Sequence, residues 1–172
     1  RDYISYDKMG PNIKLAVIAS EDQLFPDHDG FDIKAIKKAI KYNEKHKAKV
    51  RGASTISQQV AKNVFLWQGR SYFRKGLEAY FTILIEIIWG KERIMEVYLN
   101  SIEMGNGVYG AQEAARYWYR KDCSNLTKIE AAGIAAILPN PRKFKASNSS
   151  AFINARKARI VKRMRQVGTL KY

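Results

Sequence analysis

One segment that is apolar on nearly every side constrains the fold of this chain more than any other feature. Between residues 79 and 89 only Thr82 and Glu86 interrupt a run of aliphatic and aromatic residues. A helix that is apolar all round is typical of a buried position, so the sequence predicts that this helix lies in the centre of the domain. A buried acid is costly without a partner. We therefore expect Glu86 to be paired, and Glu78, just before the segment, to be paired or used in function.

Helical periods recur along the rest of the chain. Further helices are predicted at residues 11–21, 33–46, 92–100, 111–119, 126–138 and 152–167, with another that begins after Ser54 or Thr55. Convincing alternating strand patterns are scarce, which predicts a mainly α fold. The glycine-rich loop at 105–110 has no strand before it, which argues against a Rossmann nucleotide site. A length of 172 residues with 46% hydrophobic content suits one domain with a proper core.

Two of these helices carry cations beside an apolar face. In the 33–46 segment Ile33, Ile36, Ala39 and Ile40 share one side and lysines occupy the other. A solvated surface is the ordinary interpretation of such lysines, and contact with anionic lipid headgroups is the alternative. The basic tail at 45–51 predicts a mobile loop. In the last helix the expected inward residues are Phe152, Ile160, Val161 and Met164.

The charge balance indicates an anionic partner. A net charge of +15 arises from 31 Lys and Arg against 16 Asp and Glu, which suits nucleic acid, a phosphorylated ligand or an acidic membrane surface. The single cysteine, Cys123, excludes an internal disulfide framework, and two histidines beside it argue against a structural zinc site. No apolar run reaches the roughly 18 residues of a spanning helix, and no signal-peptide pattern opens the chain.

Acidic residues are concentrated after the first helix. Residues 21–32 contain five acids and one histidine in an otherwise basic chain. The helix at 11–21 places Glu21 at its negative end, beside Asp22, where a carboxyl group should be harder to ionise. That is how a general acid or base is tuned. The alternative is structural: Asp22 and Asp32 cap helices and His28 is a core residue with its hydrogen bonds satisfied.

A second polar motif covers residues 52–63. Gly52 gives backbone freedom, and Ser54 or Thr55 is suited to cap the next helix, whose free N–H groups would attract phosphate. Thr55, Gln59 and Lys62 fall on one stripe of that helix. Such a stripe is most often exposed surface. A row of hydrogen-bond donors with a lysine at its end is also what a pyrophosphate pocket would present.

A third motif places cations beside a carboxylate. Arg70, Arg74 and Lys75 precede Glu78, and in a helix Arg74 and Lys75 share a face with that acid. An exposed ion pair that contributes less than about 1 kcal/mol is the plain alternative.

Taken together, the motifs resemble those of the peptidoglycan glycosyltransferases, the murein polymerases found alone or fused to penicillin-binding transpeptidase domains. The similarity is carried by Glu21, Asp22, Phe25, His28, Gly30 and Asp32, by Gly52, Ser54, Thr55, Ile56, Gln58, Gln59, Lys62 and Asn63, and by Arg74, Lys75 and Glu78. It continues through 98–100, 105–110, 130–132 and 139–141 in the family's order. Ser57 and the Glu103–Met104 pair depart from the family pattern and touch none of the expected chemistry.

This resemblance implies a lysozyme-like, two-lobed helical domain with a central cleft. The whole chain, residues 1–172, would be one glycosyltransferase domain, normally behind an N-terminal transmembrane anchor that we expect to be absent from these residues. It would be the monofunctional type or a fragment of a longer enzyme. The enzyme would act at the extracytoplasmic face of the cell membrane on lipid II and the growing glycan, and release undecaprenyl pyrophosphate. An anionic membrane surface and cell-wall synthesis proteins are the expected partners, and nucleic acid is not.

The resemblance also implies roles for individual residues. Glu21 would be the general base, and the basic residues Lys62, Arg70, Arg74 and Lys75 would stabilise the departing pyrophosphate. Glu78 would orient these cations or hold a divalent Mg or Mn ion; no organic cofactor is expected. The acceptor side would be shaped by Asp22, Phe25 and His28. Donor sugars or phosphate would contact Ser54, Thr55, Gln59 and Asn63.

Three other functions fit parts of the sequence. A lysozyme-like glycan-cleaving enzyme would share the fold and a catalytic acid, yet would need no pyrophosphate site. A nucleic-acid-binding module would place aromatic residues among exposed basic ones, whereas most aromatic residues here are in apolar helices. A membrane-surface scaffold would keep the 33–41 helix and tolerate the loss of Glu21.

Overall fold

A computed structural model describes residues 2–46, 52–67, 69 and 71–170. The mainly α prediction is confirmed. The α-helices in this part of the chain are α1 (Pro11–Glu21), α2 (Ile33–Lys45), α3 (Ile56–Phe65), α4 (Tyr72–Ile88), α5 (Gly90–Ser101), α6 (Ala111–Tyr119), α7 (Lys128–Ile137) and α8 (Ala151–Val167). Two short 3₁₀ turns, Tyr6–Lys8 and Cys123–Asn125, and an antiparallel hairpin of β1 (Glu103–Gly105) and β2 (Val108–Tyr109) complete the described fold.

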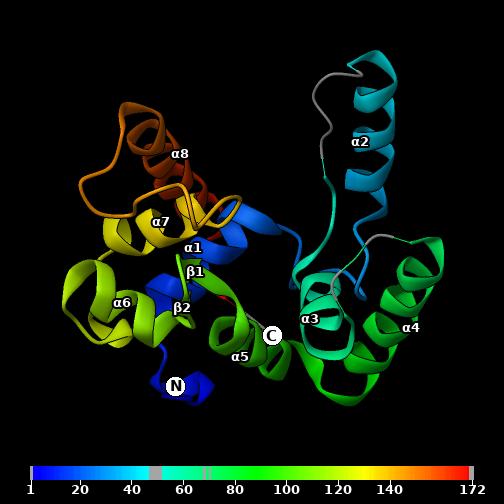
Figure 1. Cartoon of the computed structure of the whole chain (residues 1–172), viewed down its shortest axis with the longest axis horizontal. Coiled ribbons are helices and arrows are strands. Elements are labelled where there is room, and N and C mark those ends of the chain that lie inside the picture. The colour runs from blue at the N-terminus through cyan, green and yellow to red at the C-terminus, as the bar shows by residue number, and fades with distance from the viewer. Residues whose placement is uncertain (1, 47–51, 68, 70, 171–172) are drawn as a thin grey trace.

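The core forms where α1, α7 and α8 pack against one another. Every residue of α7 from Ala131 to Ile137 is buried, and small side chains there let neighbouring helices approach closely. A Cβ at Gly133 would stand 2.3 Å from the Tyr119 hydroxyl, so only glycine fits. In Figure 1 these helices lie with α6 and the hairpin on one side of the molecule, α2, α3 and α4 lie on the other, and α5 lies between the two groups. Helix α3 packs on both α4 and α5, which joins the two sides.

Polar caps set where several helices begin. Pro11 occupies the first turn of α1, as predicted. Thr55, rather than Ser54, caps α3, and its hydroxyl is paired with Gln58 in a capping box. Asp32 caps α2 by accepting the backbone N–H of Ala35 over 2.8 Å.

The prediction that residues 79–89 form the central helix of the domain is wrong. The buried residues of α4 are Glu78, Thr82 and Ile85. Its other side is open to solvent, with Tyr80 57%, Ile83 49%, Ile87 75% and Ile88 70% exposed. Helix α4 lies at the edge of the molecule, where α3 and α5 cover one face (Figure 1). An all-apolar helix therefore leaves a large apolar surface uncovered here.

Two amphipathic faces also differ from expectation. In α2 only Ala39 is buried, whereas Ile33 and Ile40 are 57% and 55% exposed, because α2 projects away from the other helices (Figure 1). In α8 Phe152 is 57% exposed, and Ile153 is buried in its stead. The expected inward positions of Ile160 and Met164 are confirmed, and Val161 is half-buried. The predicted mobile loop after α2 falls mainly on residues 47–51, outside the described residues.

Over the residues that the structure describes, none of the helices combines the length and the apolar character that crossing a bilayer requires.

Candidate active site

Glu21 ends α1 and turns its carboxylate toward polar groups from three helices. Ser20 donates its hydroxyl hydrogen to Glu21 Oε1 over 2.9 Å. The side-chain amide of Gln59 on α3 also favours the ionised form of this carboxylate. Arg156 Nη2 on α8 lies 3.9 Å from Glu21 Oε1. The side chain keeps 18% of its surface exposed, so a substrate hydroxyl can reach it.

The surroundings of Glu21 make it a better proton acceptor than an ordinary carboxylate. Burial raises the pKa of Glu21 above its ordinary value of 4.5, and the nearby charge of Asp22 adds to the effect. The hydrogen bond from Ser20, the charge of Arg156 and the side-chain amide of Gln59 oppose the rise in the pKa without cancelling it. The helix-end prediction for Glu21 is therefore confirmed in direction, although burial is the main cause. The raised pKa of this carboxylate is closer to the pKa of an effective general base.

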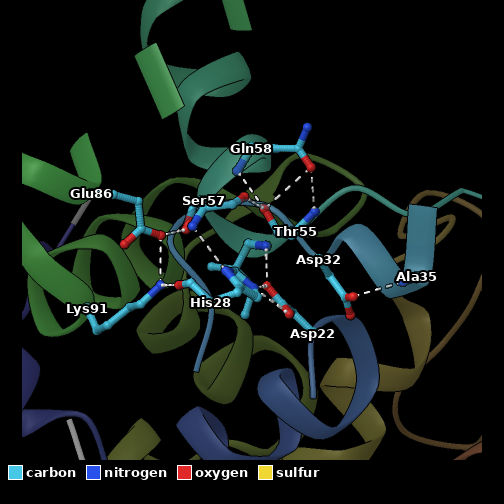
Figure 2. A network of polar contacts seen from close by, with 11 residues as sticks. Asp22, His28, Asp32, Ala35, Thr55, Ser57, Gln58, Glu86 and Lys91 are labelled. Atoms are coloured by element: carbon cyan, nitrogen blue, oxygen red, sulfur yellow. Dashed lines mark hydrogen bonds and ion pairs between the residues drawn. The ribbon is translucent and has the colours of Figure 1, made fainter. Parts of the chain in front are cut away.

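Asp22 and His28 form the centre of a buried network (Figure 2). His28 Nδ1 accepts the N–H of Gly30 over 3.1 Å, which leaves Nε2 to donate its proton to Asp22, 2.9 Å from each carboxylate oxygen. Asp22 Oδ2 also accepts the backbone N–H of Ile56 over 2.9 Å, at the first turn of α3. Phe25, predicted on the acceptor side, has no exposed surface. These residues hold the loop after Glu21 in place from the inside.

A second arm of the network reaches α4 and α5 (Figure 2). Ser57 donates to Glu86 Oε1 over 2.5 Å, and Lys91 Nζ lies 2.8 Å from the same oxygen. Lys91 Nζ also donates to the backbone carbonyl of His28. The expectation that Glu86 is paired is thus confirmed, and its partner Lys91 fixes the loop of His28 as well.

The predicted donor-side residues are divided between interior and surface. Thr55 is 2% exposed and donates its hydroxyl hydrogen to the Gly30 carbonyl over 2.6 Å, so this group is already used inside the protein. Ser54, Lys62 and Asn63 have exposed side chains and stay available to a ligand.

The basic cluster is also only partly free. Glu78 is 3% exposed and its carboxylate pairs with Lys75, as the shared helix face predicted. Lys75 keeps 55% of its side chain exposed, and Arg74 Nε is buried with no hydrogen-bond partner among the residues that the structure describes. Arg70 lies outside the described residues.

The described residues contain no group of three or more His, Cys, Asp or Glu that could hold a metal ion. Glu78 is the one predicted ligand, and Lys75 occupies its carboxylate. The protein side chains described here therefore do not fit a self-contained Mg or Mn site.

Arg156 was absent from the residues predicted for the site. Its helix also contains Lys157, Arg159, Lys162, Arg163 and Arg165, which is typical of a solvated helix face, and nothing in the spacing links Arg156 to Glu21. Packing of α8 against α1 brings the two together. Tyr98, which donates its hydroxyl hydrogen to Gln59 Oε1 over 3.3 Å, was likewise absent from the residues predicted for the site.

A half-buried carboxylate with a raised pKa, beside polar and basic groups from two other helices in a strongly basic chain, defines an enzyme site for acid–base chemistry on an anionic substrate. The transglycosylase family model matches residues 1–165, and the chain belongs to this family.

Curated relatives agree over nearly the whole chain. A biosynthetic peptidoglycan transglycosylase of Pseudomonas syringae pv. tomato is 54% identical over 172 residues, all of this chain and 72% of that protein. One of Escherichia coli is 53% identical over 167 residues, 97% of this chain and 69% of that protein. One of Xanthomonas campestris pv. campestris is 55% identical over 162 residues, 94% of this chain and 65% of that protein. The resemblance drawn from the motifs is confirmed.

Proposed function

We propose that the protein is a peptidoglycan glycosyltransferase that polymerises lipid II into linear glycan strands. The observation that carries the proposal is the geometry of Glu21: a buried, partly accessible carboxylate at the end of α1 with a raised pKa. Membership of the transglycosylase family and the names of the relatives support the same reaction.

In this reaction Glu21 is the general base. The 4-hydroxyl of the GlcNAc on an incoming lipid II attacks C1 of the MurNAc that ends the growing glycan. Glu21 takes the hydroxyl proton as the new C1–O bond forms, and the bond from C1 to the pyrophosphate oxygen breaks with inversion. Undecaprenyl pyrophosphate leaves with the bonding electrons.

The exposed cations suit the leaving group. Negative charge gathers on the pyrophosphate as it departs, and Lys62 and Lys75 are available to stabilise it. Arg74, whose buried Nε has no hydrogen-bond partner in the described part of the chain, would gain one from a phosphate oxygen. We assign Glu78 to holding Lys75 in position through their ion pair. A Mg or Mn ion at the pyrophosphate remains a proposal in which Glu78 would supply one ligand and the substrate most of the others, and no step above depends on it.

We further propose that the enzyme acts at the extracytoplasmic face of the cell membrane. The uncovered apolar side of α4, which includes Tyr80, Ile83, Ile87 and Ile88, would enter the interface of the bilayer, and the lysines of α2 would meet anionic headgroups. A substrate on a long lipid chain requires such a location. Cell-wall synthesis proteins are proposed as further partners.

The reaction is tested with labelled lipid II in detergent, with products resolved by size. We expect long glycan from the parent protein and none from Glu21→Gln. Glu113→Gln, at an acid on α6 whose side chain is 41% exposed, is the matched control and should stay active. Cleavage of preformed glycan without polymerisation would move the protein to the hydrolase class. No reaction by the parent would reject both enzymes and favour a scaffold.

The membrane proposal is tested by flotation with vesicles that contain anionic lipid. Ile87→Glu should weaken vesicle binding without lowering the melting temperature, because Ile87 is 75% exposed. Ile129→Glu, at a 53% exposed isoleucine on α7, is the matched control and should bind as the parent does. Equal binding by all three proteins would reject α4 as the membrane surface.

A further inference from the structure

The hydroxyl group of Ser20 lies between two groups that can only accept a hydrogen bond. Its oxygen is 2.9 Å from Glu21 Oε1 and 3.3 Å from the backbone carbonyl oxygen of Ala135 on α7. An ionised carboxylate and a backbone carbonyl are acceptors, so Ser20 is the donor in both contacts. A hydroxyl group has one hydrogen, which serves one of the two acceptors at a time. This hydrogen therefore has two possible directions.

The Ala135 carbonyl can accept the hydrogen because its partner within the helix is missing. In an α-helix it would bind the N–H four residues further on, and that residue is Pro139, which has no N–H. In the described structure the backbone N–H of Leu138 reaches this carbonyl instead, over a long 3.4 Å. Ala135 has no exposed surface, so water does not compete for the carbonyl. Pro139 thus leaves a buried acceptor beside Ser20.

The contacts of the Glu21 carboxylate are on one of its two oxygens. Ser20 donates to Oε1, and Arg156 Nη2 lies 3.9 Å from the same oxygen. In the part of the chain that the structure describes, no hydrogen bond of ordinary geometry ends on Oε2. Oε2 is therefore the oxygen that is left to take a proton from a substrate.

We propose that Ser20 is a positioning residue for the general base. Its hydroxyl group holds Oε1 while Glu21 is ionised, which leaves Oε2 for the substrate, and it turns to the Ala135 carbonyl once Glu21 has taken the proton. The role of Glu21 as the base rests on the proposed function, whereas the two contacts of Ser20 do not.

The charge of Glu21 selects the acceptor. A hydrogen bond to an ionised carboxylate is about twice as strong as one between neutral groups, so the Ser20 hydrogen faces Oε1 before the reaction. When the hydroxyl proton of the substrate arrives on Oε2, the carboxyl group becomes neutral and this advantage disappears. The Ala135 carbonyl then keeps the hydroxyl group bonded. Ser20 has a partner in both states, so the change costs no unsatisfied polar group.

Other charged or titratable groups also face Glu21. They are Asp22 beside it, Arg156 on α8 and the phenol of Tyr98 on α5. On α7, which packs against α1, the buried residues from Ala131 to Ile137 carry no charge. In the described structure none of the three groups hydrogen-bonds the Ala135 carbonyl, so this carbonyl senses the protonation of Glu21 through Ser20.

Ser20→Ala removes the hydroxyl group and leaves a residue that favours helices. The pKa of Glu21 should rise further, because its ionised form loses a donor, and NMR titration with ¹³C-labelled glutamate and no substrate measures this. The acid limb of the pH–rate profile should move to higher pH. We expect glycan synthesis to fall about 2- to 10-fold on that limb, as the loss of one hydrogen bond predicts, and to approach the parent rate at alkaline pH. Ser20→Thr, which keeps a hydroxyl group, should retain the parent titration.

The carbonyl carbon of Ala135 provides the second measurement. In the parent protein its ¹³C signal should change over the pH range in which Glu21 titrates, because the Ser20 hydrogen turns toward it. In Ser20→Ala the same signal should stay constant through that range. A constant Ala135 signal in the parent protein would overturn the proposed turn of the hydroxyl group.

Ser149→Ala is the matched control. The Ser149 hydroxyl group also lies between two acceptors, the backbone carbonyls of Lys145 and Ala146, each at 2.9 Å, and both are neutral. We expect this variant to keep the parent titration of Glu21 and the parent pH–rate profile. An unchanged Glu21 titration in Ser20→Ala, or an equal change in Ser149→Ala, would overturn the proposal.

The titrations need no substrate, which separates this inference from the proposed reaction. If the parent makes no glycan and both NMR results are as expected, the role of Ser20 beside Glu21 is supported and only the proposed reaction is rejected. Active parent protein with an unchanged Glu21 titration in Ser20→Ala would reject the positioning role and leave the reaction standing.

Discussion

Arg156 Nη2 on α8 lies 3.9 Å from Glu21 Oε1 at the end of α1. The distance is too long for a hydrogen bond, so the guanidinium acts on the carboxylate mainly through its charge. Arg156 is itself held in an unfavourable place, because its Nε is buried with no hydrogen-bond partner in the described structure. Burial lowers the pKa of Arg156 as well, although Glu21 opposes that change. A residue that costs stability and faces the base is expected to serve function.

Replacement of Arg156 should separate stability from activity. Arg156→Leu removes an unsatisfied buried donor, so we expect the free energy of unfolding to stay the same or to rise by up to about 1 kcal/mol, since an unpaired polar group is costly. Activity should fall most at acidic pH, because Glu21 loses a stabilising charge. Urea unfolding and pH–rate profiles measure the two effects. Arg159→Leu, at an exposed arginine of the same helix, should change neither quantity appreciably.

The Glu21 site should also make the folded protein less stable as the pH rises. Because the pKa of Glu21 is raised by burial, the folded state binds more protons than the unfolded state between the ordinary pKa of 4.5 and the folded value. The free energy of unfolding therefore decreases across that window. Glu21→Gln should have a higher melting temperature than the parent at pH 7 to 8, and the difference should vanish below pH 4.5.

Glu103→Gln is a control of opposite sign. Although burial opposes the change, hydrogen bonds from Arg142 and Gly107 lower the pKa of Glu103 overall. Its ionised form stabilises the fold above the ordinary pKa, and this contribution is lost as the pH falls through the folded value. The substitution should therefore be destabilising at neutral pH. A Glu21→Gln variant that is less stable than the parent at pH 8 would contradict the argument for Glu21.

Local signals in the sequence predicted most helices and the position of Glu21. Pro11, Asp32 and Thr55 act on the backbone within a few residues, so their effect can be deduced without the tertiary fold. The environment of each helix could not be deduced in this way. The apolar segment at 79–89 does not reveal which neighbours cover it, and Arg156 reaches Glu21 only because α8 packs on α1.

The motifs also did not predict which of their side chains point into the protein and which point toward a ligand. Thr55, Asp22 and His28 belong to the motifs that indicated the family, and the structure uses their polar groups inside the protein. Neighbours in the same motifs, such as Ser54 and Lys62, stay exposed. A single motif therefore contains both ligand-facing residues and residues that hold the loop.

The Glu86–Lys91 pair should be important for stability. Both side chains are largely buried, at 9% and 14% exposure. Lys91→Met leaves a buried carboxylate without its cation, and we expect the free energy of unfolding to fall by about 3 kcal/mol or more. Glu86→Gln with Lys91→Met should recover most of that loss, because no charge is left unpaired. Arg93→Met breaks a pair in which Arg93 is 50% exposed, and it should cost less than about 1 kcal/mol. Denaturant unfolding of the four proteins measures these differences.

Gly30 should tolerate no side chain, for two separable reasons. Its φ of +91° is in the region that favours glycine, and a Cβ there would stand 2.8 Å from Thr82 Cγ2 and 3.2 Å from Glu86 Cγ. Gly107 has a similar φ of +74° with nothing within 4 Å of its Cβ position, so Gly107→Ala measures the backbone strain alone. We expect about 1 to 2 kcal/mol for Gly107→Ala, and a further 1 to 3 kcal/mol for Gly30→Ala from the forced contacts.

The rate of lipid II polymerisation should differ between Gly30→Ala and Gly107→Ala even more clearly than stability does. The contacts of Gly30 with His28 and Thr55 tie the loop that follows Glu21 to the start of α3. Displacement of Gly30 by a methyl group would therefore move Asp22 and the base beside it, and a small shift of a catalytic group is enough to reduce the rate strongly. Gly107→Ala should polymerise lipid II at close to the parent rate. Equal losses of stability and activity in the two variants would show that the loop does not position Glu21.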